Sequence, residues 1–484
     1  PLPLIPRRDF LTGAGLTFAA LAAGSVGWQA ANARRRLAGL PQLAVRSRPN
    51  VLLLVMDTVR AQSMSLHGYG RSTSPNLDRL AASGVRFDRA IASAPWTLPS
   101  HATMFTGRWH HELSADWLSP LDTAYPTLAE ALRGQGYLTA GFVANVFYAS
   151  YEHGLNRGFV HYEDYTRTAG EILAGASLGR TLGCWNRNEI GCQLRPTLGY
   201  YELLGRKTAA RVNQEFLDWH AAQDGSRPFF AFLNYFDAHA PYLPPAPYDG
   251  RFSSGITRGN PMHINLKDWE WTPDQQQAEQ DAYDSAIAYV DDQIGQLLAE
   301  LEARGALENT LVLVTSDHGE EFGEHGVMAH SNSLYLPSLY VPLIAAMPGR
   351  VPAGLQVPNA FSLRDIPATV LDLLQIDGQS PFPGRSLARF WPDRDPAAAM
   401  PEPLISQVTG LSFRPAGYPV SKGTMLSVVL NHLHYIRRGD AAEELYDIDA
   451  DPWETADLAA TADGAARLAE FRAALADVPI ADSM

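Results

Sequence analysis

The sequence predicts an α/β fold with a large, mostly parallel central sheet flanked by helices and a small C-terminal α+β subdomain. Short apolar runs at 51–56, 228–235 and 310–315 are typical of buried parallel strands. Helical segments alternate with them, which is the pattern of a parallel sheet covered by helices on both faces. From about 401 the chain changes to shorter strand-like pieces and one last helix, which indicates the small subdomain.

The remaining elements follow from periodicity and end signals. Helices are expected between and after these strands, at 74–81, 127–134, 207–222, 279–304 and 365–374. Two further strands of the main sheet are expected at 137–143 and 340–345. The C-terminal region offers strand-like pieces at 404–408, 425–430 and 434–437, then 444–449 and a helix at 464–475.

The domain organisation follows from the chain length and from the change to shorter strand-like segments after about residue 401. With 484 residues, the chain is long enough for one large domain and a smaller one. We expect a catalytic domain over 48–400, with an insertion at about 166–200, and a C-terminal subdomain over 401–484. Trp269 and Trp271, in a second irregular segment, are expected to pack over the long helix, or alternatively to stack on a sugar or aryl group.

Composition and charge exclude several classes of protein. Hydrophobic residues make up 46% and charged residues 19% of the chain, which describes a globular protein and excludes a disordered or fibrous one. The formal net charge is −14, and no basic patch in the sequence offsets it. We therefore expect no nucleic-acid partner.

The first 33 residues have the features of an export signal. Arg7-Arg8 precede an apolar, small-residue run at 14–28, and Ala31-Asn32-Ala33 provide a small-x-small cleavage site. The paired arginines resemble a twin-arginine signal, which a receptor reads as an address. We expect an exported protein, periplasmic or otherwise extracytoplasmic. The alternative is an uncleaved signal that attaches the protein to a membrane.

Two cysteines, Cys184 and Cys192, lie within the insertion. Two thiols cannot form a closed zinc site, and no pair of histidines lies nearby at ligand spacing. In an exported protein a local disulfide is the expected state. Two unrelated free thiols are the alternative.

Polar residues follow three of the predicted strands. Asp57 ends the run at 51–56, Asp237 and His239 follow the run at 228–235, and Asp317 and His318 follow the run at 310–315. In open α/β sheets, functional sites lie outside the carboxyl ends of the strands. One such residue would merely cap a loop, but three strand ends together predict a site.

Thr97 is the hydroxyl expected to face these strand ends. It lies before Pro99-Ser100 and a short helical run, at a junction where helix N–H groups and the helix dipole favour an anion. Taken alone, Thr97 would be a helix cap. Together with carboxylates and an imidazole, it fits a divalent metal site. The ion would lower the pKa of the hydroxyl and neutralise an incoming anionic ester.

These residues resemble the sulfatase family of the alkaline phosphatase superfamily. The resemblance extends from about residue 48 to 458. The motifs are specific for the family when they occur together in this order, although no single motif is. Its motifs are Asn50 to Asp57, Ser93 to Gly107, Tyr289 to Gly295, Ser316 to Glu320, Asn332 to Tyr335, Val341 to Ile344, Gly384 to Leu387 and Glu444 to Asp447.

The resemblance implies an alkaline phosphatase-like α/β sandwich, one divalent metal ion, and a nucleophile at the position of Thr97. Asp317 and His318 match one pair of metal ligands, and Asp57 matches one member of the other pair. His239, in an Asp-x-His-x-Pro-Tyr pattern, and His330 match positions that contact the anionic group of the ester.

The departures from the family pattern concern the nucleophile and its surroundings. Sulfatases carry Cys or Ser, oxidised to formylglycine, in a Cys/Ser-x-Pro-x-Arg pattern, whereas this chain has Thr97-Leu-Pro-Ser-His101. Oxidation of a threonine would give a ketone, so the formylglycine hydrate is not accessible here. The first acidic pair is reduced to Asp57-Thr58, and Gly141 to Ala144 replace a Gly-Lys-Trp-His element that binds sulfate.

A threonine at this position is similar to related phosphotransferases and phosphodiesterases, such as lipoteichoic acid synthase and phosphoethanolamine transferases, which form a phospho-threonine. We therefore predict a metal-dependent hydrolase or transferase of phosphate mono- or diesters. The substrate would be a small-molecule, glycan-linked or lipid-linked anionic ester. Mn²⁺, Zn²⁺ or Ca²⁺ is the expected metal, with Mg²⁺ as a further option.

Each candidate residue has an expected role. The expected metal ligands are Asp57, Thr97, Asp317 and His318. His239 and His330 are expected to bind the ester oxygens or protonate the leaving group, while His101 and Arg60 are additional candidates for catalysis and substrate binding, respectively. Asp237 would orient His239, support a second metal or cap its strand.

Two other functions compete with this prediction. One is a sulfuric ester hydrolase, like an arylsulfatase, that uses Thr97 without formylglycine. The other is a catalytically inactive family member that keeps the fold and the metal as a binding protein. Retention of Thr97 together with the three other expected metal ligands counts against the inactive protein.

Overall fold

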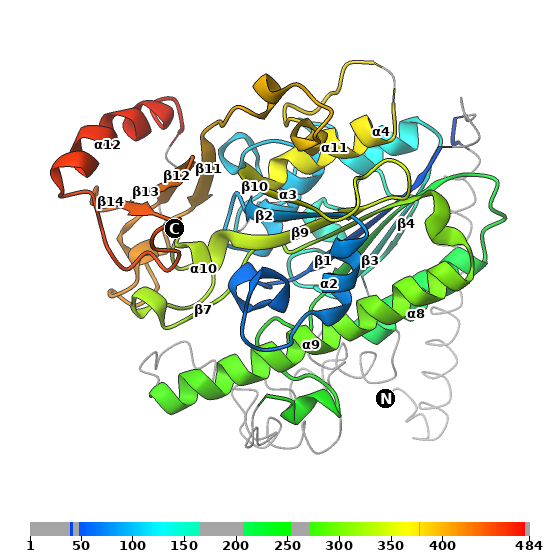
Figure 1. The fold of residues 1–484 in the computed structure, drawn as a ribbon, viewed down its shortest axis with the longest axis horizontal. Coiled ribbons are helices and arrows are strands. Elements are labelled where there is room, and N and C mark those ends of the chain that lie inside the picture. The colour runs from blue at the N-terminus through cyan, green and yellow to red at the C-terminus, as the bar shows by residue number, and fades with distance from the viewer. Residues whose placement is uncertain are drawn as a thin grey trace, which may run out of the picture.

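The computed structural model describes residues 39–41, 48–117, 119–164, 207–252, 272–376 and 378–479. Its centre is an eight-stranded sheet with the order β10-β2-β9-β6-β1-β5-β3-β4 (Figure 1). The strands are β1 (Asn50–Met56), β2 (Val85–Ile91), β3 (Leu138–Val143), β4 (His161–Glu163), β5 (Phe229–Tyr235), β6 (Thr310–Thr315), β9 (Tyr340–Ala346) and β10 (Leu355–Ser362). Because β9 alone runs antiparallel to its two neighbours, the sheet is mostly parallel, as predicted.

The two faces of the sheet are buried under different helices. Alternate residues of β1 point to opposite faces, with Val51 and Leu53 in one core and Leu52 and Leu54 in the other. One face packs against α3 (Thr97–Thr106), α4 (Leu128–Gly134) and α11 (Ile366–Leu373). The other packs against α2 (Pro75–Ala82), α8 (Ala209–Ala221) and α9 (Pro273–Ala303) (Figure 1). The strands therefore read as continuous apolar runs because both faces are covered.

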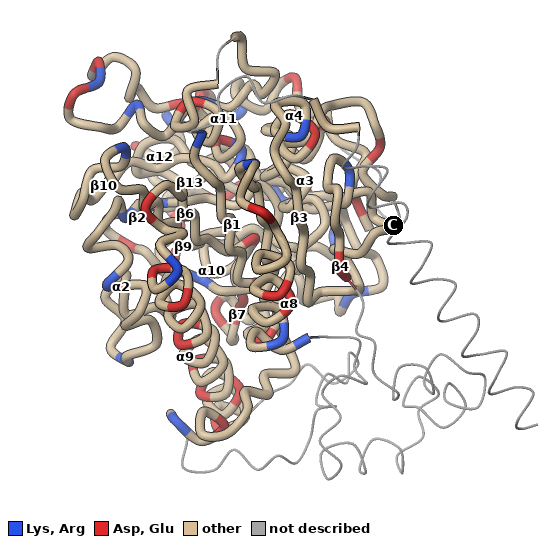
Figure 2. Tube along the Cα trace, turned by 90° about the vertical axis from the view of Figure 1, so that its right-hand side faces the viewer, with Lys and Arg blue, Asp and Glu red and all other residues tan. Residues whose placement is uncertain are grey.

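The long helix α9 begins six residues earlier than the apolar periodicity predicts, at Pro273 instead of Glu279. Thr272 caps it, since its side chain accepts a hydrogen bond from the Gln275 N–H and its own N–H donates to the Gln275 side chain. The first turns are polar and exposed, so the apolar stripe does not reveal them. This helix contains acidic residues and no Lys or Arg, as Figure 2 shows along its length.

The C-terminal region forms a second, antiparallel sheet with the order β11-β12-β13-β14. Its elements are β11 (Leu404–Val408), β12 (Met425–Leu430), β13 (Leu433–Arg437), β14 (Glu443–Asp447) and the helix α12 (Ala462–Ala474). One face of this sheet joins the core around α3, and the other packs against α12. The Gln407 N–H donates to the Ser93 carbonyl, so β11 adjoins the segment that leads into α3.

The structure confirms the predicted fold class and extends it. The strands β2 and β10, which pair in parallel at one edge of the large sheet, were not predicted. The strand β10 lies at the edge and has exposed residues, whereas β2 lies between β10 and β9 with several partly buried charged residues, so neither sequence has a continuous apolar run. Within the described ranges, no helix combines the length and the apolar character that a membrane span requires.

Several predictions fall on parts of the chain outside the described residues. They are the signal at 1–33, the insertion at 166–200 with Cys184 and Cys192, and the segment that contains Trp269 and Trp271.

Candidate active site and metal centre

Thr97 is the first residue of α3, and its hydroxyl does not act as a helix cap. The residue before it, Trp96, is extended and takes the cap position without a side-chain hydrogen bond. The Thr97 side chain is buried, and its Oγ1 accepts a hydrogen bond of 3.2 Å from Nδ2 of Asn145. The hydroxyl therefore lies at the positive end of a ten-residue buried helix, where an anion is favoured.

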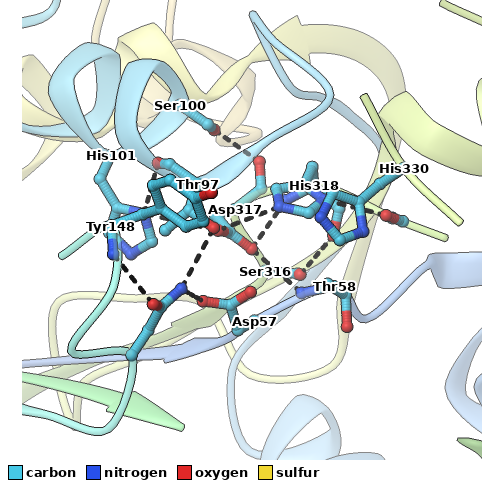
Figure 3. Close-up of polar contacts among 12 residues, drawn as sticks. Asp57, Thr58, Thr97, Ser100, His101, Tyr148, Ser316, Asp317, His318 and His330 are labelled. Atoms are coloured by element: carbon cyan, nitrogen blue, oxygen red, sulfur yellow. Dashed lines mark hydrogen bonds and ion pairs between the residues drawn. The ribbon is translucent and has the colours of Figure 1, made fainter. Parts of the chain in front are cut away.

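The sheet brings the predicted strand ends together beneath this helix. The strands β1 and β6 are parallel neighbours, with Val55 opposite Thr315, so Asp57 and Asp317 emerge side by side. Ligand atoms of Asp57, Asp317 and His318 lie within 4.8 Å of one another, and all three residues are fully buried. Figure 3 shows these side chains converging below Thr97.

The unpartnered atoms of this cluster fit a divalent cation. Oδ1 of Asp57, Oδ2 of Asp317 and Nε2 of His318 are buried and have no hydrogen-bond partner. Buried polar atoms in proteins are nearly always satisfied, and these three unpartnered atoms lie close enough together to bind one shared cation. Two carboxylate oxygens and one imidazole suit Mn²⁺ or Zn²⁺ better than an all-oxygen set would.

The electrostatics of the cluster support the same conclusion. Burial and the neighbouring Asp317 carboxylate raise the pKa of Asp57 well above its usual value, and burial also raises the pKa of Asp317. Two buried carboxylates that repel each other are unfavourable without a cation. Burial lowers the pKa of His318 to about 3, which keeps its imidazole neutral, the form that binds metals.

Two asparagines hold Asp57, and the sequence did not reveal either. Asn145, just after β3, donates to Oδ2 of Asp57 at 2.9 Å as well as to Thr97. Asn234 donates to the same oxygen at 3.3 Å, and its Oδ1 accepts from the Asn145 N–H at 2.9 Å. The available signal was a polar residue at position 234 within an otherwise apolar strand, where a buried amide needs partners.

Thr58 follows Asp57 in a strained backbone conformation, with φ of 64°. This is the left-handed region, which a β-branched residue rarely adopts. Its N–H donates to Oδ1 of Asp317 at 3.1 Å, and its hydroxyl donates to the Ala238 carbonyl at 2.8 Å. Through these two hydrogen bonds Thr58 connects the ends of β1, β5 and β6. Strained backbone of this kind persists where the surrounding contacts fix it, and it is common at functional sites.

His101 lies one helical turn after Thr97 and belongs to the same cluster. Its Nδ1 is 2.8 Å from the Thr97 carbonyl oxygen and 3.5 Å from Oδ2 of Asp317. The ring is fully buried, and burial lowers its pKa, which favours the neutral imidazole. A neutral ring whose Nδ1–H donates to the helix carbonyl has its Nε2 unpartnered, as found.

His239 and His330 lie together at the side of the cluster. Their ring centroids are 4.9 Å apart, and the His330 ring is 4.6 Å from the His318 ring. Nδ1 of His239 is 2.7 Å from the Ala240 carbonyl oxygen, and Nδ1 of His330 is 2.8 Å from Oε1 of Glu320. Both rings are half-buried. The structure therefore brings together Thr97, Asp57, Asp317, His318, His101, His239 and His330.

Arg60 is placed differently from the expectation that it binds substrate. Its guanidinium is buried, pairs with Glu324 at 2.7 Å, and donates to the Glu320 carbonyl at 3.0 Å. These partners, Glu320 and Glu324, lie in the loop after β6. We correct the expectation accordingly and assign Arg60 a structural role.

Asp237 acts as a cap in this structure. Its Oδ2 accepts a hydrogen bond of 2.9 Å from the Ala209 N–H, at the start of α8. This contact joins the end of β5 to the start of α8. His325, in the loop after β6, stacks its ring on Tyr335 at 3.6 Å between centroids.

Comparisons with known proteins identify the family of this chain. The family model described as Sulfatase matches residues 49–376. The chain is similar to arylsulfatase K from Bos taurus, with 26% identity over 468 residues, 85% of this chain and 78% of the relative. It is also similar to an arylsulfatase from Clostridium perfringens, with 25% identity over 401 residues, 72% of this chain and 79% of the relative.

Among solved structures, the fold is similar to that of the phosphonate monoester hydrolase of Agrobacterium radiobacter. The TM-score is 0.67 at 24% identity, and the match covers 87% of this chain and 94% of the other. The family match spans the strand ends, α3 and the loop that carries His330, and it extends over more than half of the chain. The chain therefore belongs to the sulfatase family.

Proposed function

We propose that this protein is a metal-dependent hydrolase or transferase of phosphate mono- and diesters that uses Thr97 as its nucleophile. The observation that carries the proposal is the Thr97 hydroxyl itself, placed at the start of α3 and linked through Asn145 to Asp57. The hydroxyl is a threonine, so the chemistry must proceed without formylglycine.

Four side chains would hold the metal: Asp57, Asp317, His318 and Thr97. A divalent cation there supplies a lowered pKa for the hydroxyl and charge neutralisation for the anionic ester. The orphaned oxygens and nitrogen of the first three support this assignment.

The reaction has two balanced displacements. The Thr97 hydroxyl first loses its proton to solvent. Its oxygen then forms a bond to phosphorus as the bond to the leaving-group oxygen breaks, and His330 or His239 supplies the proton that the leaving group takes. Water or an acceptor hydroxyl then attacks the phospho-threonine, gives up its proton to the same imidazole, and releases Thr97.

The nature of the ester follows from the same residue. A threonyl phosphate can be opened by in-line attack at phosphorus, whereas sulfatase chemistry of the usual kind needs an aldehyde that threonine cannot form. The neutral His101 in place of the family arginine also lowers the positive charge around the nucleophile. Both features support phosphate, in a small molecule or linked to a glycan or lipid, as the substrate group.

A sulfuric ester is the second candidate, and the names of the relatives favour it, since both curated relatives are arylsulfatases. In that case Thr97 would attack sulfur directly. We also retain export from the cytoplasm as a proposal that rests on the first 33 residues of the sequence.

A substrate panel tests the function. The purified protein, loaded in turn with Mn²⁺, Zn²⁺ and Ca²⁺, is given an aryl phosphate, an aryl phosphodiester and an aryl sulfate. We expect turnover of a phosphate ester, loss of it in Thr97→Ala, and partial activity in Thr97→Ser, which keeps the hydroxyl. Turnover of the sulfate alone would overturn phosphate specificity. Metal binding without any turnover would favour the inactive binding protein.

A further inference from the structure

Arg414 brings a guanidinium group from the C-terminal subdomain to the edge of the catalytic centre. It lies in the loop between β11 and β12, and its Nη2 is 3.5 Å from the hydroxyl oxygen of Ser331. Ser331 directly follows His330, and its N–H donates a hydrogen bond of 2.9 Å to the Pro95 carbonyl, two residues before Thr97. The guanidinium therefore adjoins a loop of the catalytic centre from a separate part of the chain.

An aromatic surface that includes Tyr148 adjoins the segment that carries Thr97. The Tyr148 N–H donates a hydrogen bond of 3.1 Å to Oδ1 of Asn145, the residue whose Nδ2 bonds to Thr97 (Figure 3). The Tyr148 ring is 5.8 Å from the ring of Trp96, which stacks in turn on Trp117 at 4.4 Å between centroids. Aromatic rings of this kind pack well against the organic part of a small ester.

The charge of Arg414 lies close to the Tyr148 end of this surface. Burial lowers the pKa of Arg414, and the hydroxyl groups of Tyr418 and Tyr148 counteract that effect. A phenol hydroxyl is a weaker partner for a guanidinium than a carboxylate or a phosphate, each of which can accept two parallel N–H bonds. An anionic group that a substrate brings to this place would therefore interact with Arg414 more strongly than these hydroxyls do.

This edge of the site borders solvent, so a substrate can reach it. Phe413, next to Arg414, is 69% exposed, whereas Arg414 itself is half-buried. The guanidinium lies over the Phe413 ring, at 5.7 Å from its centroid. Phe147, next to Tyr148, is also exposed.

We propose that Arg414 binds a second anionic group of the substrate, a carboxylate or a phosphate on the organic part of the ester, while that part packs along Tyr148. The proposal rests on the proposed function and adds the substrate class: esters that carry a further negative charge beyond the reacting group. The reacting group faces the metal ligands and the start of α3, whereas Arg414 contacts Ser331, outside the ligand set. This placement favours the organic part as the partner of Arg414.

Matched pairs of aryl phosphates test this selectivity. One member of each pair carries a carboxylate at position 3 or 4 of the ring, and the other carries the neutral carboxamide at the same position. Phenylene bisphosphates replace the carboxylate with a second phosphate. Arg414→Gln removes the charge, and Arg414→Lys keeps the charge but lacks the planar fork. Lys422→Gln is the control, because it removes a charge from the same subdomain at an exposed residue that pairs with Asp440 at 3.2 Å.

The ratio of kcat/KM for the charged member to that for the neutral member should fall by about 10- to 100-fold in Arg414→Gln, as expected for a lost hydrogen bond to a charged group. The loss should lie in KM, because the second group is bound equally in the ground state and the transition state. Arg414→Lys should keep part of the selectivity, and Lys422→Gln should keep all of it. Whichever of the carboxylates and bisphosphates shows the larger fall identifies the anionic group. Equal losses for both members of a pair, or an unchanged ratio in Arg414→Gln, would overturn the proposal.

Binding gives a readout that does not depend on turnover. Calorimetric titration of the metal-loaded protein with 3- and 4-carboxybenzylphosphonate and their carboxamides should show tighter binding of a carboxylate, and Arg414→Gln should lose this difference. Equal affinities in the wild type and in Arg414→Gln would overturn the proposal, and a thermal melt shows whether each variant keeps its fold. If only sulfates are hydrolysed, the proposed function fails, yet the same pairs prepared as sulfates still test Arg414 on their own result.

Discussion

The side chain of Asn145 donates a hydrogen bond of 2.9 Å to Oδ2 of Asp57. The same amide group lies 3.2 Å from the Thr97 hydroxyl, so one donor spans a metal ligand and the nucleophile. It occupies one oxygen of Asp57 and leaves the other, Oδ1, without a protein partner. The relative position of carboxylate and hydroxyl is thereby fixed by a residue that belongs to neither strand β1 nor helix α3.

Substitution of Asn145 should impair catalysis while the fold is kept. Asn145→Asp retains the Oδ1 acceptor that binds the Phe147 and Tyr148 N–H groups, but it replaces the donor with an oxygen that faces Asp57. We expect kcat/KM to fall by about 10- to 100-fold or more, since residues that orient ligands commonly have effects of this size. Steady-state kinetics beside a thermal melt would check it, and unchanged kinetics would show that the contact has no catalytic role.

The effect of Asp317→Asn on the free energy of unfolding should change sign when the metal is removed. Without a cation, Asp317→Asn should be more stable than the wild type at neutral pH, because burial and mutual repulsion disfavour two ionised carboxylates. With the cation at a hundred times its Kd, the wild type should gain about 2.7 kcal/mol that the variant lacks. Urea unfolding with chelator and with Mn²⁺ or Zn²⁺ measures both. The same rank order in both conditions would contradict the assigned ligand set.

Burial of Asp291 should make stability depend on pH. This residue of α9 accepts hydrogen bonds from the N–H groups of Asn76 and Leu77, and burial raises its pKa to about 6. A raised folded-state pKa favours the folded state fully below the unfolded value near 3.8, and this contribution is lost as the pH rises to about 6.

The stability of the wild type should therefore fall relative to Asp291→Asn between pH 4 and 6 and stay level above that range. Thermal or urea unfolding across this range measures the difference, and Asp274→Asn, at an exposed position of the same helix, serves as the control. A constant difference between wild type and Asp291→Asn would contradict the shift.

Two glycine substitutions should have opposite effects. In α9, a Cβ at Gly295 would lie 2.2 Å from the Asn76 side-chain oxygen. That side chain is held by Asp291 at 2.7 Å, so it cannot move aside freely. Gly295→Ala should destabilise the protein by about 1–3 kcal/mol. Gly134→Ala in α4 meets no atom within 4 Å and should be neutral or stabilising by up to about 1 kcal/mol. Equal effects in denaturant melts would refute the steric argument.

Much of the site could be predicted because it lies at the ends of strands whose continuous apolar runs are easily recognised in the sequence. Asp57 and Asp317 directly follow apolar runs, and parallel strands bring such positions to one edge. Thr97 alone would have been taken for a helix cap, and it became a candidate nucleophile through the three strand ends and the family resemblance. The structure places it as the first residue of α3.

The residues that the sequence did not reveal act through tertiary contacts. Asn145 lies in no sequence pattern, and its role depends on which side chains the fold places beside it. Arg60 was an additional candidate for substrate binding, but its guanidinium is buried and pairs with Glu324. The strands β2 and β10 were missed because their sequences contain charged or polar residues and lack the continuous apolar run of the central strands.

The most direct test of the account is a search for a phosphoryl group on Thr97 during turnover. The metal-loaded enzyme is mixed with an aryl phosphate, quenched rapidly in acid, and digested for mass spectrometry, with Thr97→Ala treated in parallel. The account predicts one added phosphoryl group on the peptide that contains Thr97, localised to that residue and absent from the variant. Turnover with the phosphoryl group on another residue, or undiminished turnover in Thr97→Ala, would contradict it.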